Sequence, residues 1–184
     1  MKTRLFSDIG ADAATEVYRY CLGHALEVLN ISALDVEIWL TETCSDPIFA
    51  NHHCQLQRGF DLGERMLYAL RQGLATGTDQ PVLLIGSDCL DLKPAHLHLA
   101  LESLIRHDLV FLPCVDGGFA MIGCRRIEQS LFDGVIWSSS SVLRQTLKNA
   151  EKLKLSVDML ETVRDIDTLQ DLNHYPELRE LTAS

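Results

Sequence analysis

The sequence predicts a layered α/β domain with a mostly parallel sheet. Apolar runs at 82–86, 109–113 and 119–123 are typical of strands that are covered on both faces. Stretches with apolar residues every three or four positions separate several of the predicted strands and indicate amphipathic helices. Strands that alternate with helices along a chain are characteristic of α/β architecture.

Periodicity and capping residues locate the individual elements. Helices are predicted at about 12–30, 61–73 and 94–106, and from the serines at 138–141 to about 153. Asp61 precedes the second helix and Glu64 follows three residues later, in a capping-box-like arrangement, while Pro94 fits the first turn of the third. Residues 35–41 alternate as a strand, 82–86 predict a central strand, and 42–60 predict a loop because they have no steady period.

Composition limits the classes of protein and ligand. No linker, repeat or low-complexity tract divides the 184 residues, so 1–184 are predicted to form a single domain. The net charge of −10 argues against non-specific binding to nucleic acid or to an anionic membrane. No apolar run approaches the length of about 18 residues that a membrane span needs, and the start is polar. Six cysteines without a CxxC motif fit a reduced, cytoplasmic protein.

Acidic residues follow the apolar runs, where open α/β sheets bind ligands. Asp88 and Asp91 come after 82–86, and two carboxylates at a strand end can hold a hard cation. Alternatively, one of them caps the helix that begins near Pro94. Asp116 stands before Gly117 and Gly118, which form either a hairpin turn or a close backbone approach to a ligand, or both.

Weaker candidates lie elsewhere in the chain. Asp165 follows no simple capping pattern, whereas Asp167 or Thr168 can start a helix near Leu169. The basic Lys2-Thr3-Arg4 segment can grip phosphate or can be a frayed terminus. The His52-His53-Cys54 sequence, with Cys44 upstream, has poor spacing for a soft metal, so an ordinary loop is the default. P-loop, GxGxxG and GxSxG motifs are absent from the sequence.

Five ordered motifs resemble one family over nearly the whole chain. The sequence is similar to the bacterial glycosyltransferase-like, selenodomain-associated transferases, which belong to the nucleotide-diphospho-sugar transferase superfamily and are related to the guanylyltransferases of molybdenum-cofactor synthesis. The motifs are Lys2-Thr3-Arg4-Leu5, Gln57-x-Gly59-x-Asp61-Leu62-Gly63-Glu64-Arg65-Met66, Gly86-Ser87-Asp88-Cys89-x-Asp91-Leu92, Asp116-Gly117-Gly118-Phe119 and Asp165-Ile166-Asp167-Thr168-x-x-Asp171-Leu172.

The resemblance implies a three-layer, Rossmann-like (GT-A-like) fold with a mixed, mostly parallel sheet. It implies that the protein binds a nucleoside triphosphate or nucleotide-sugar together with Mg²⁺ or Mn²⁺. By the same resemblance, Asp88 and Asp116 are catalytic, and Asp88 and Asp91 hold the metal. The implied nucleotide-binding residues are Lys2, Arg4, Gly59, Arg65 and Ser87, and those on the side of the unknown small-molecule acceptor are Gly117, Gly118, Ser139 and Asp165.

The sequence departs from the family pattern at its start. Members normally begin with an apolar strand and a Pro-Gly turn before the Lys-Thr-Arg-Leu motif, which here begins directly after Met1. The usual first strand is therefore expected to be missing, through a truncated or misassigned start or through loss of part of the nucleotide pocket. Smaller departures are Leu90 in place of proline and Ser139 in place of threonine.

Three functions remain compatible with these patterns. The first is a metal-dependent nucleotidyl- or glycosyltransferase, whose chemistry is attack on an α-phosphorus or an anomeric carbon. The second is a non-catalytic binding or assembly protein, including a homodimer, that uses a sheet edge left open by the missing strand. The third is a metal-dependent phosphatase or hydrolase, which needs a base, and the candidates His24, His96, His98 and His107 all lie in predicted helices.

Overall fold

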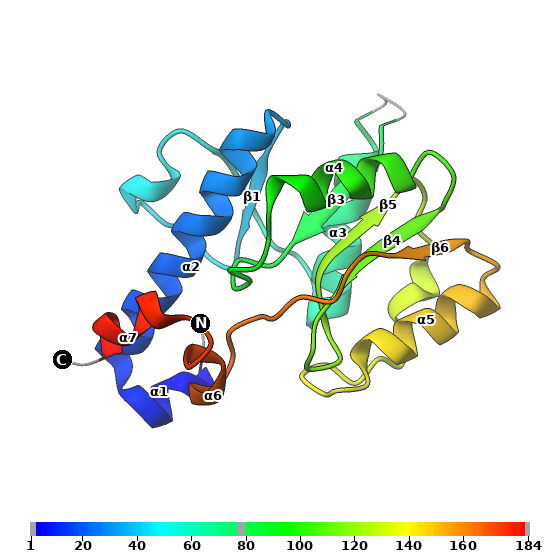
Figure 1. Ribbon diagram of the computed structural model, residues 1–184. Coiled ribbons are helices and arrows are strands. Elements are labelled where there is room, and N and C mark those ends of the chain that lie inside the picture. Colours follow the sequence, from blue (N-terminus) through cyan, green and yellow to red (C-terminus); the bar gives the residue numbers. More distant parts are fainter. Residues whose placement is uncertain (1–2, 77–79, 183–184) are drawn as a thin grey trace.

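A computed structural model describes residues 3–76 and 80–182 of the protein (Figure 1). The strands are β1 (Glu37–Leu40), β2 (His53–Leu56), β3 (Val82–Ile85), β4 (Leu109–Pro113), β5 (Phe119–Cys124) and β6 (Val157–Met159). The α-helices are α1 (Thr3–Ile9), α2 (Ala11–Ser32), α3 (Leu62–Leu74), α4 (Pro94–Ser103), α5 (Val142–Lys152), α6 (Leu169–Leu172) and α7 (Pro176–Thr182). Two short 3₁₀ helices are η1 (Pro47–Phe49) and η2 (Gln129–Phe132).

The larger sheet has four strands in the order β3-β5-β4-β6. β5 is antiparallel to both β3 and β4, whereas β6 is parallel to β4. It follows that β3, β4 and β6 point the same way and that β5 runs against them. β1 and β2 form a separate parallel pair. The prediction of a mixed sheet in which most strands share one direction is confirmed, and three carboxyl ends meet at one edge of the larger sheet.

Helices cover both faces of this sheet. Val110 and Leu112 of β4 pack in a cluster with α2 and α4, while Leu109 and Phe111 pack on the other face with α3 and α5. All four side chains have no exposed surface, as the alternation of side chains along a strand requires when both faces are covered. The three-layer arrangement expected from the sequence is therefore present.

A helical corner stands beside the sheet, at the left of Figure 1. α1, α2, α6 and α7 share a buried apolar cluster to which Leu5, Val17 and Ile166 contribute. Ile166 belongs to the segment that leads from β6 to α6. The corner therefore anchors the chain next to the carboxyl edge of the sheet.

Most predicted elements are present, but two predictions about strands were wrong. β3 is an end strand of its sheet rather than a central one, and its residues are partly exposed. The side chains of an apolar run pack against helices above and below the sheet. They do not indicate whether the backbone of the strand pairs with a neighbour on one side or on both. The predicted loop at 42–60 contains β2, which pairs with β1 although its own four residues are exposed. An exposed strand lacks the apolar alternation on which sequence prediction depends.

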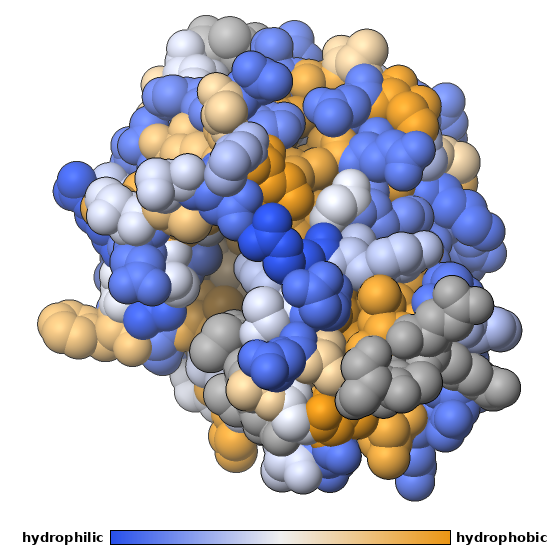
Figure 2. All heavy atoms as spheres, turned by 90° about the vertical axis from the view of Figure 1, so that its left-hand side faces the viewer, coloured by the Kyte–Doolittle hydropathy of each residue, from blue (hydrophilic) through white to orange (hydrophobic). Residues whose placement is uncertain are grey.

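Polar side chains dominate one face of the molecule. Figure 2 shows the left-hand side of Figure 1, where polar side chains surround smaller apolar areas. Within residues 3–76 and 80–182, we find no helix whose length and apolar character would let it cross a membrane.

The N-terminal cap of α3 provides a test of local stability. Asp61 Oδ1 accepts a hydrogen bond from Glu64 N at 2.8 Å, and Glu64 Oε2 accepts one from Phe60 N at 2.8 Å. We expect Asp61→Ala to lower the free energy of unfolding by about 1 kcal/mol because the cap is lost. Asp61→Asn should retain most of the stability, since asparagine also caps helices. Urea denaturation measures both, and equal losses would contradict the capping role.

Candidate metal and nucleotide site

The candidate site lies at the carboxyl edge of the four-stranded sheet. Asp88 follows β3, Asp116 follows β4 and Asp165 follows β6. Because these three strands point the same way, their carboxyl ends bring the three acidic residues to one edge. The direction of the strands therefore unites residues that are far apart in the sequence.

The segment from Val163 to Ile166 joins the loops that follow β3 and β4. Val163 N donates to Pro113 O at 2.9 Å, and Val115 N donates to Val163 O at 3.0 Å. Farther along, Ile166 N donates to Asp88 O at 2.9 Å. Asp165 is thus held between the loop that carries Asp116 and the loop that carries Asp88.

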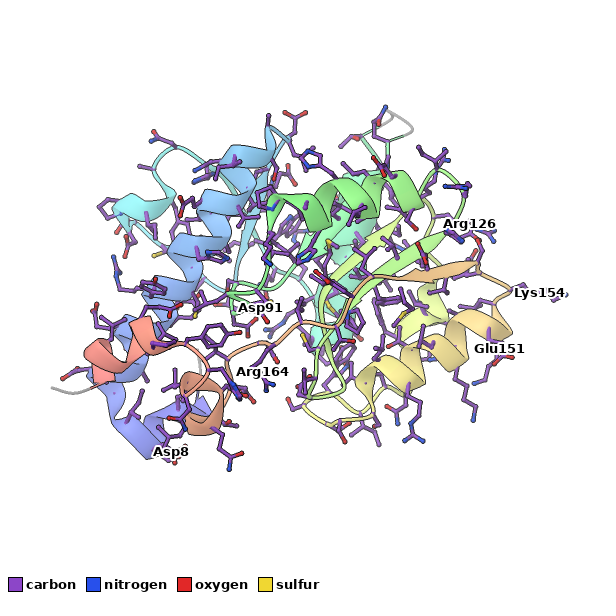
Figure 3. All side chains as sticks on the ribbon, viewed as in Figure 1. Asp8, Asp91, Arg126, Glu151, Lys154 and Arg164 are labelled. Atoms are coloured by element: carbon purple, nitrogen blue, oxygen red, sulfur yellow. The ribbon has the colours of Figure 1, made fainter. Side chains whose placement is uncertain are left out.

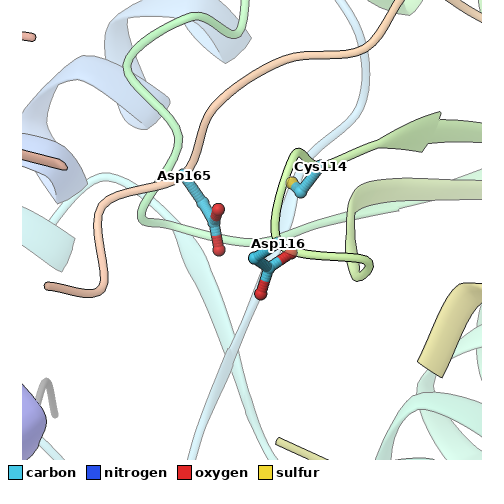
Figure 4. A group of neighbouring side chains, drawn as sticks. All are labelled: Cys114, Asp116 and Asp165. Carbon is cyan, nitrogen blue, oxygen red and sulfur yellow. The ribbon is translucent and has the colours of Figure 1, made fainter. Parts of the chain in front are cut away.

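Cys114, Asp116 and Asp165 form a compact group (Figure 4). One ligand atom from each lies within 4.8 Å of the others. Cys114 is buried, Asp165 is partly buried and Asp116 is exposed. The group therefore has a buried sulfur on its inner side and a carboxylate open to solvent on its outer side.

These donor atoms fit a divalent cation. Two ligand atoms of one ion lie at most twice the metal–ligand distance apart, about 4–5 Å, and the group lies near this limit. Carboxylate oxygens suit Mg²⁺ and Mn²⁺, whereas a thiolate favours softer ions such as Zn²⁺. The group is therefore a candidate metal site with mixed donors, the choice of Mg²⁺ or Mn²⁺ stays a prediction, and Cys114 adds a donor that the sequence patterns did not single out.

Burial and negative charge keep the two cysteines of the site in the thiol form. Burial raises the pKa of Cys114, and the nearby charges of Asp165, Asp116 and Asp88 raise it further. Burial likewise raises the pKa of Cys89 to about 12. Cys89 Sγ lies 3.4 Å from Arg164 O, to which it donates. Only a bound cation would favour a Cys114 thiolate here.

The turn between β4 and β5 positions Asp116. Gly118 N donates to Asp116 Oδ1 at 2.7 Å, and Leu143 N donates to Gly117 O at 3.0 Å. Gly117 has a φ of 91°, and a Cβ at this position would collide with the carbonyl oxygen of Ser140. The predicted hairpin is confirmed, and its glycine is also required by the close approach of the Ser139–Ser141 turn.

Ser139 has a local hydrogen-bonding role in that turn. Its Oγ donates to Ile136 O at 2.7 Å and lies 2.8 Å from Ser141 Oγ. The segment between β5 and α5 therefore packs against Gly117 in a defined conformation. Substrate binding by Gly117, Gly118 and Ser139 remains a prediction from the family resemblance.

Asp91 stabilises the site from outside the acidic group. Asp91 Oδ2 accepts a hydrogen bond from Arg164 N at 3.0 Å, and Tyr175 Oη donates to Arg164 O at 3.1 Å. Figure 3 shows Asp91 and Arg164 next to each other. The alternative that Asp88 or Asp91 caps α4 was wrong, because Lys93 is the N-cap residue. The geometry thus gives Asp91 a positioning contact, and its role as a metal ligand remains untested.

The predicted nucleotide-binding residues are only partly described. Ser87 follows β3, and Arg65 Nε donates to Gly59 O at 3.2 Å at the start of α3. Arg4 lies in α1, where its side chain is not described, and Lys2 lies outside the described residues. Phosphate binding by these basic residues stays a prediction.

The other candidate groups do not meet in a metal site. Among residues 3–76 and 80–182, the acidic group with Cys114 is the single cluster of the required geometry, so His52, His53 and Cys54 form none there. Three of the four histidines considered as a hydrolytic base contact groups outside the acidic group: His24 Nε2 lies 2.9 Å from Leu92 O, His96 Nε2 lies 2.8 Å from Glu161 Oε1, and His107 Nδ1 lies 3.1 Å from Ser103 O. A hydrolytic role for any of the four histidines stays a prediction.

The glycine at the turn gives a test with a matched control. Gly134 also has a positive φ, 68°, but a Cβ there would meet no atom within 4 Å. We expect Gly117→Ala to lower the free energy of unfolding by about 1–3 kcal/mol more than Gly134→Ala, because only Gly117 adds a collision to the backbone strain. Urea denaturation compares the two, and similar losses would show that Ser140 moves away freely.

Asp171 supports the segment that carries Asp165. Its Oδ2 accepts hydrogen bonds from Thr168 N at 2.8 Å, Thr168 Oγ1 at 2.7 Å and Asp167 N at 3.2 Å. Burial by itself would raise the pKa of this carboxyl, but these bonds and the charge of Arg164 outweigh it and hold the pKa below its usual range. A lowered folded-state pKa means that the carboxylate stabilises the fold above the usual aspartate pKa of about 3.9 and loses this effect as pH falls.

We therefore expect Asp171→Asn to lower the free energy of unfolding by about 1–2 kcal/mol at neutral pH. The difference from the unmodified protein should shrink as pH falls below about 4, because the carboxyl becomes protonated in both states. Urea denaturation at pH 7 and pH 3 measures this, with Asp8→Asn on α1 as the control for loss of an exposed carboxylate (Figure 3). A difference that does not change with pH would contradict the role of ionised Asp171.

Known proteins resemble the chain in sequence and in structure. A family model described as "Uncharacterized protein conserved in bacteria (DUF2064)" matches residues 25–139, which is more than half of the chain. No curated protein matches the chain significantly. A crystal structure from Desulfovibrio desulfuricans G20, of a protein provisionally assigned as a nucleotide-diphospho-sugar transferase, is 32% identical with a TM-score of 0.87. The match covers 96% of this chain and 80% of that one.

A second solved structure is much more distant. Rv0371c from Mycobacterium tuberculosis H37Rv is 16% identical with a TM-score of 0.48, over 89% of this chain and 84% of that one. The family match and the Desulfovibrio structure agree with the family resemblance of the sequence motifs. The chain therefore belongs to the DUF2064 family and has a fold similar to that of nucleotide-diphospho-sugar transferases.

Proposed function

We propose that the protein is a cation-dependent nucleotidyl- or glycosyltransferase that uses a nucleoside triphosphate or a nucleotide-sugar as donor. The convergence of Asp88, Asp116 and Asp165 at the carboxyl edge of the sheet carries this proposal. The 32% identical Desulfovibrio protein supports it, because it is provisionally assigned to this class. Since one fold can host both kinds of transfer, the acceptor decides between them.

The acidic residues have a clear electrostatic task in this proposal. Carboxylates at one edge of a protein with net charge −10 repel a polyphosphate, so a cation must lie between them and the donor. Asp116 and Asp165 would hold that cation, with Asp88 and Cys114 beside them. The bound Mg²⁺ or Mn²⁺ would offset charge that develops on the phosphates.

The chain's own residues would place the donor and the acceptor. The N–H of Gly118 orients the Asp116 carboxylate. The hydrogen bond from Ile166 N to Asp88 O holds the segment that carries Asp165 next to the loop that carries Asp88. Transfer gains speed from such fixed geometry, because the reacting groups are already oriented. Arg65, at the start of α3, is the basic residue that we assign to the donor phosphates. We place the protein in the cytoplasm, where its six cysteines would remain reduced.

Calorimetric titration of the purified protein tests the proposal directly. Nucleoside triphosphates and nucleotide-sugars are titrated with Mn²⁺, with Mg²⁺ and without a divalent cation. We expect cation-dependent binding that weakens by about 10–100-fold in Asp116→Asn, Asp165→Asn and Asp88→Asn. The control is Glu151→Gln, on the last turn of α5 and far from Asp91 and Arg164 (Figure 3).

Circular dichroism establishes that each variant is folded before its affinity is compared. Binding that is unchanged in Asp116→Asn and Asp165→Asn would remove these residues from the site. A folded protein that binds none of the donors, with or without a cation, would overturn the transferase proposal.

The second candidate function is binding or assembly through the open edge of β3. Gly86 N donates to Ala120 O at 2.8 Å, so the backbone N–H and C=O of every second residue, including Leu84 and Val82, point toward β5. The backbone groups of Leu83 and Ile85 point the opposite way, toward the open edge of the sheet. Among the described residues no strand pairs with that edge. A homodimer or another partner that adds a strand there is the outcome favoured if donor binding fails.

A further inference from the structure

Phe60 is the most exposed large apolar side chain among the described residues. Its side chain is 98% exposed, compared with 71% for Ile105. Single apolar residues are common on protein surfaces, so exposure alone indicates no function. Phe60 differs from the other exposed apolar residues because the loop that carries it is fixed by hydrogen bonds.

The loop before α3 holds Phe60 in one backbone conformation. Phe60 N is bound by Glu64 Oε2, and Glu64 N is bound by Asp61 Oδ1. Gly59 has a φ of 138°, and a Cβ there would lie 2.6 Å from Glu64 Cβ, so the turn is tight. Arg65 Nε closes the loop through Gly59 O. A backbone ordered before binding loses little conformational entropy when a ligand contacts the ring.

The packing of α3 places this loop at the edge that carries the acidic group. A Cβ at Gly73, near the end of α3, would lie 2.9 Å from Val82 Cγ1 at the start of β3. α3 therefore ends where β3 begins, and its first turn lies toward the carboxyl end of β3. In that turn, a Cβ at Gly63 would lie 2.7 Å from Trp137, just before the Ser139–Ser141 turn that contacts Gly117.

The loop offers a ligand a flat apolar ring between two basic residues. Arg58 lies over the ring of Tyr68 and Arg65 binds Gly59 O through Nε, and both guanidinium groups have further N–H donors. A phenyl ring stacks on the face of any nucleobase, and guanidinium groups bind phosphate.

We propose that Phe60 is the platform on which the nucleobase of the donor stacks. This inference rests on the proposed transferase function and adds a residue that contacts the base. The tight Gly59 turn holds the ring at the rim of the site, and the cation group holds the phosphates at the same edge of the sheet.

Calorimetric titration of four proteins tests the platform: the unmodified protein, Phe60→Ala, Phe60→Trp and Ile105→Ala. The probes are nucleoside triphosphates, nucleotide-sugars, the corresponding nucleosides and inorganic tripolyphosphate. We expect Phe60→Ala to lower the affinity for nucleoside triphosphates by about 5–150-fold, the range that corresponds to one lost stacking contact. Phe60→Trp should retain the affinity of the unmodified protein. Tripolyphosphate, which has no ring, should bind both Phe60 variants as it binds the unmodified protein. Ile105→Ala should leave the affinity for every probe unchanged, because Ile105 lies between the end of α4 and the start of β4, at the opposite end of the sheet from the acidic group.

Several results would overturn the platform and are distinct from failure of the transferase. Phe60 would contact no base if donors bound Phe60→Ala with unchanged affinity. The same would follow if the affinity for tripolyphosphate fell as much as the affinity for the donors. A loss confined to nucleotide-sugars would assign the ring to the sugar instead. Nucleoside triphosphates that bind equally well with and without a divalent cation, yet lose affinity in Phe60→Ala, would support the platform while overturning the cation-dependent transferase. A protein that binds no probe would overturn both.

Discussion

The hydrogen bonds of the segment from Val163 to Ile166 hold the candidate site together. They attach the segment to the end of β4 at Pro113 and to the loop after β3 at Asp88. Ile166 is fully buried in the helical corner, so the segment cannot leave the sheet without exposing apolar surface. The position of Asp165 relative to Asp116 therefore depends on backbone contacts and on packing outside the site.

Electrostatics explain why such a framework is needed. Three carboxylates held at one edge repel one another, and their charges raise the pKa of buried Cys114. The fold opposes this repulsion with hydrogen bonds to peptide groups, such as the one from Gly118 N to Asp116. In the function that we propose, a bound cation would relieve the remaining repulsion.

Close backbone packing gives the site its shape. Gly117 lies against the backbone of Ser140, and Gly63 lies against the ring of Trp137, so a side chain at either glycine would prevent the close approach. A similar tight turn at Gly59 presents Phe60 to solvent. Glycines that the sequence predicts to lie in turns therefore also allow close contacts with residues that are distant in the sequence, and local turn rules do not predict such contacts.

The sequence by itself determined the layered fold, the main helices, the hairpin at Asp116 and the acidic character of the strand ends, because apolar periodicity and turn residues act locally. It also determined the family through five ordered motifs. Only the tertiary structure decided that β3 is an end strand, that β2 exists, that Asp165 joins Asp116 and Cys114, and that Asp91 binds Arg164 N. Strand order and contacts between distant loops depend on hydrogen bonds across the sheet, and no local pattern in the chain records those bonds.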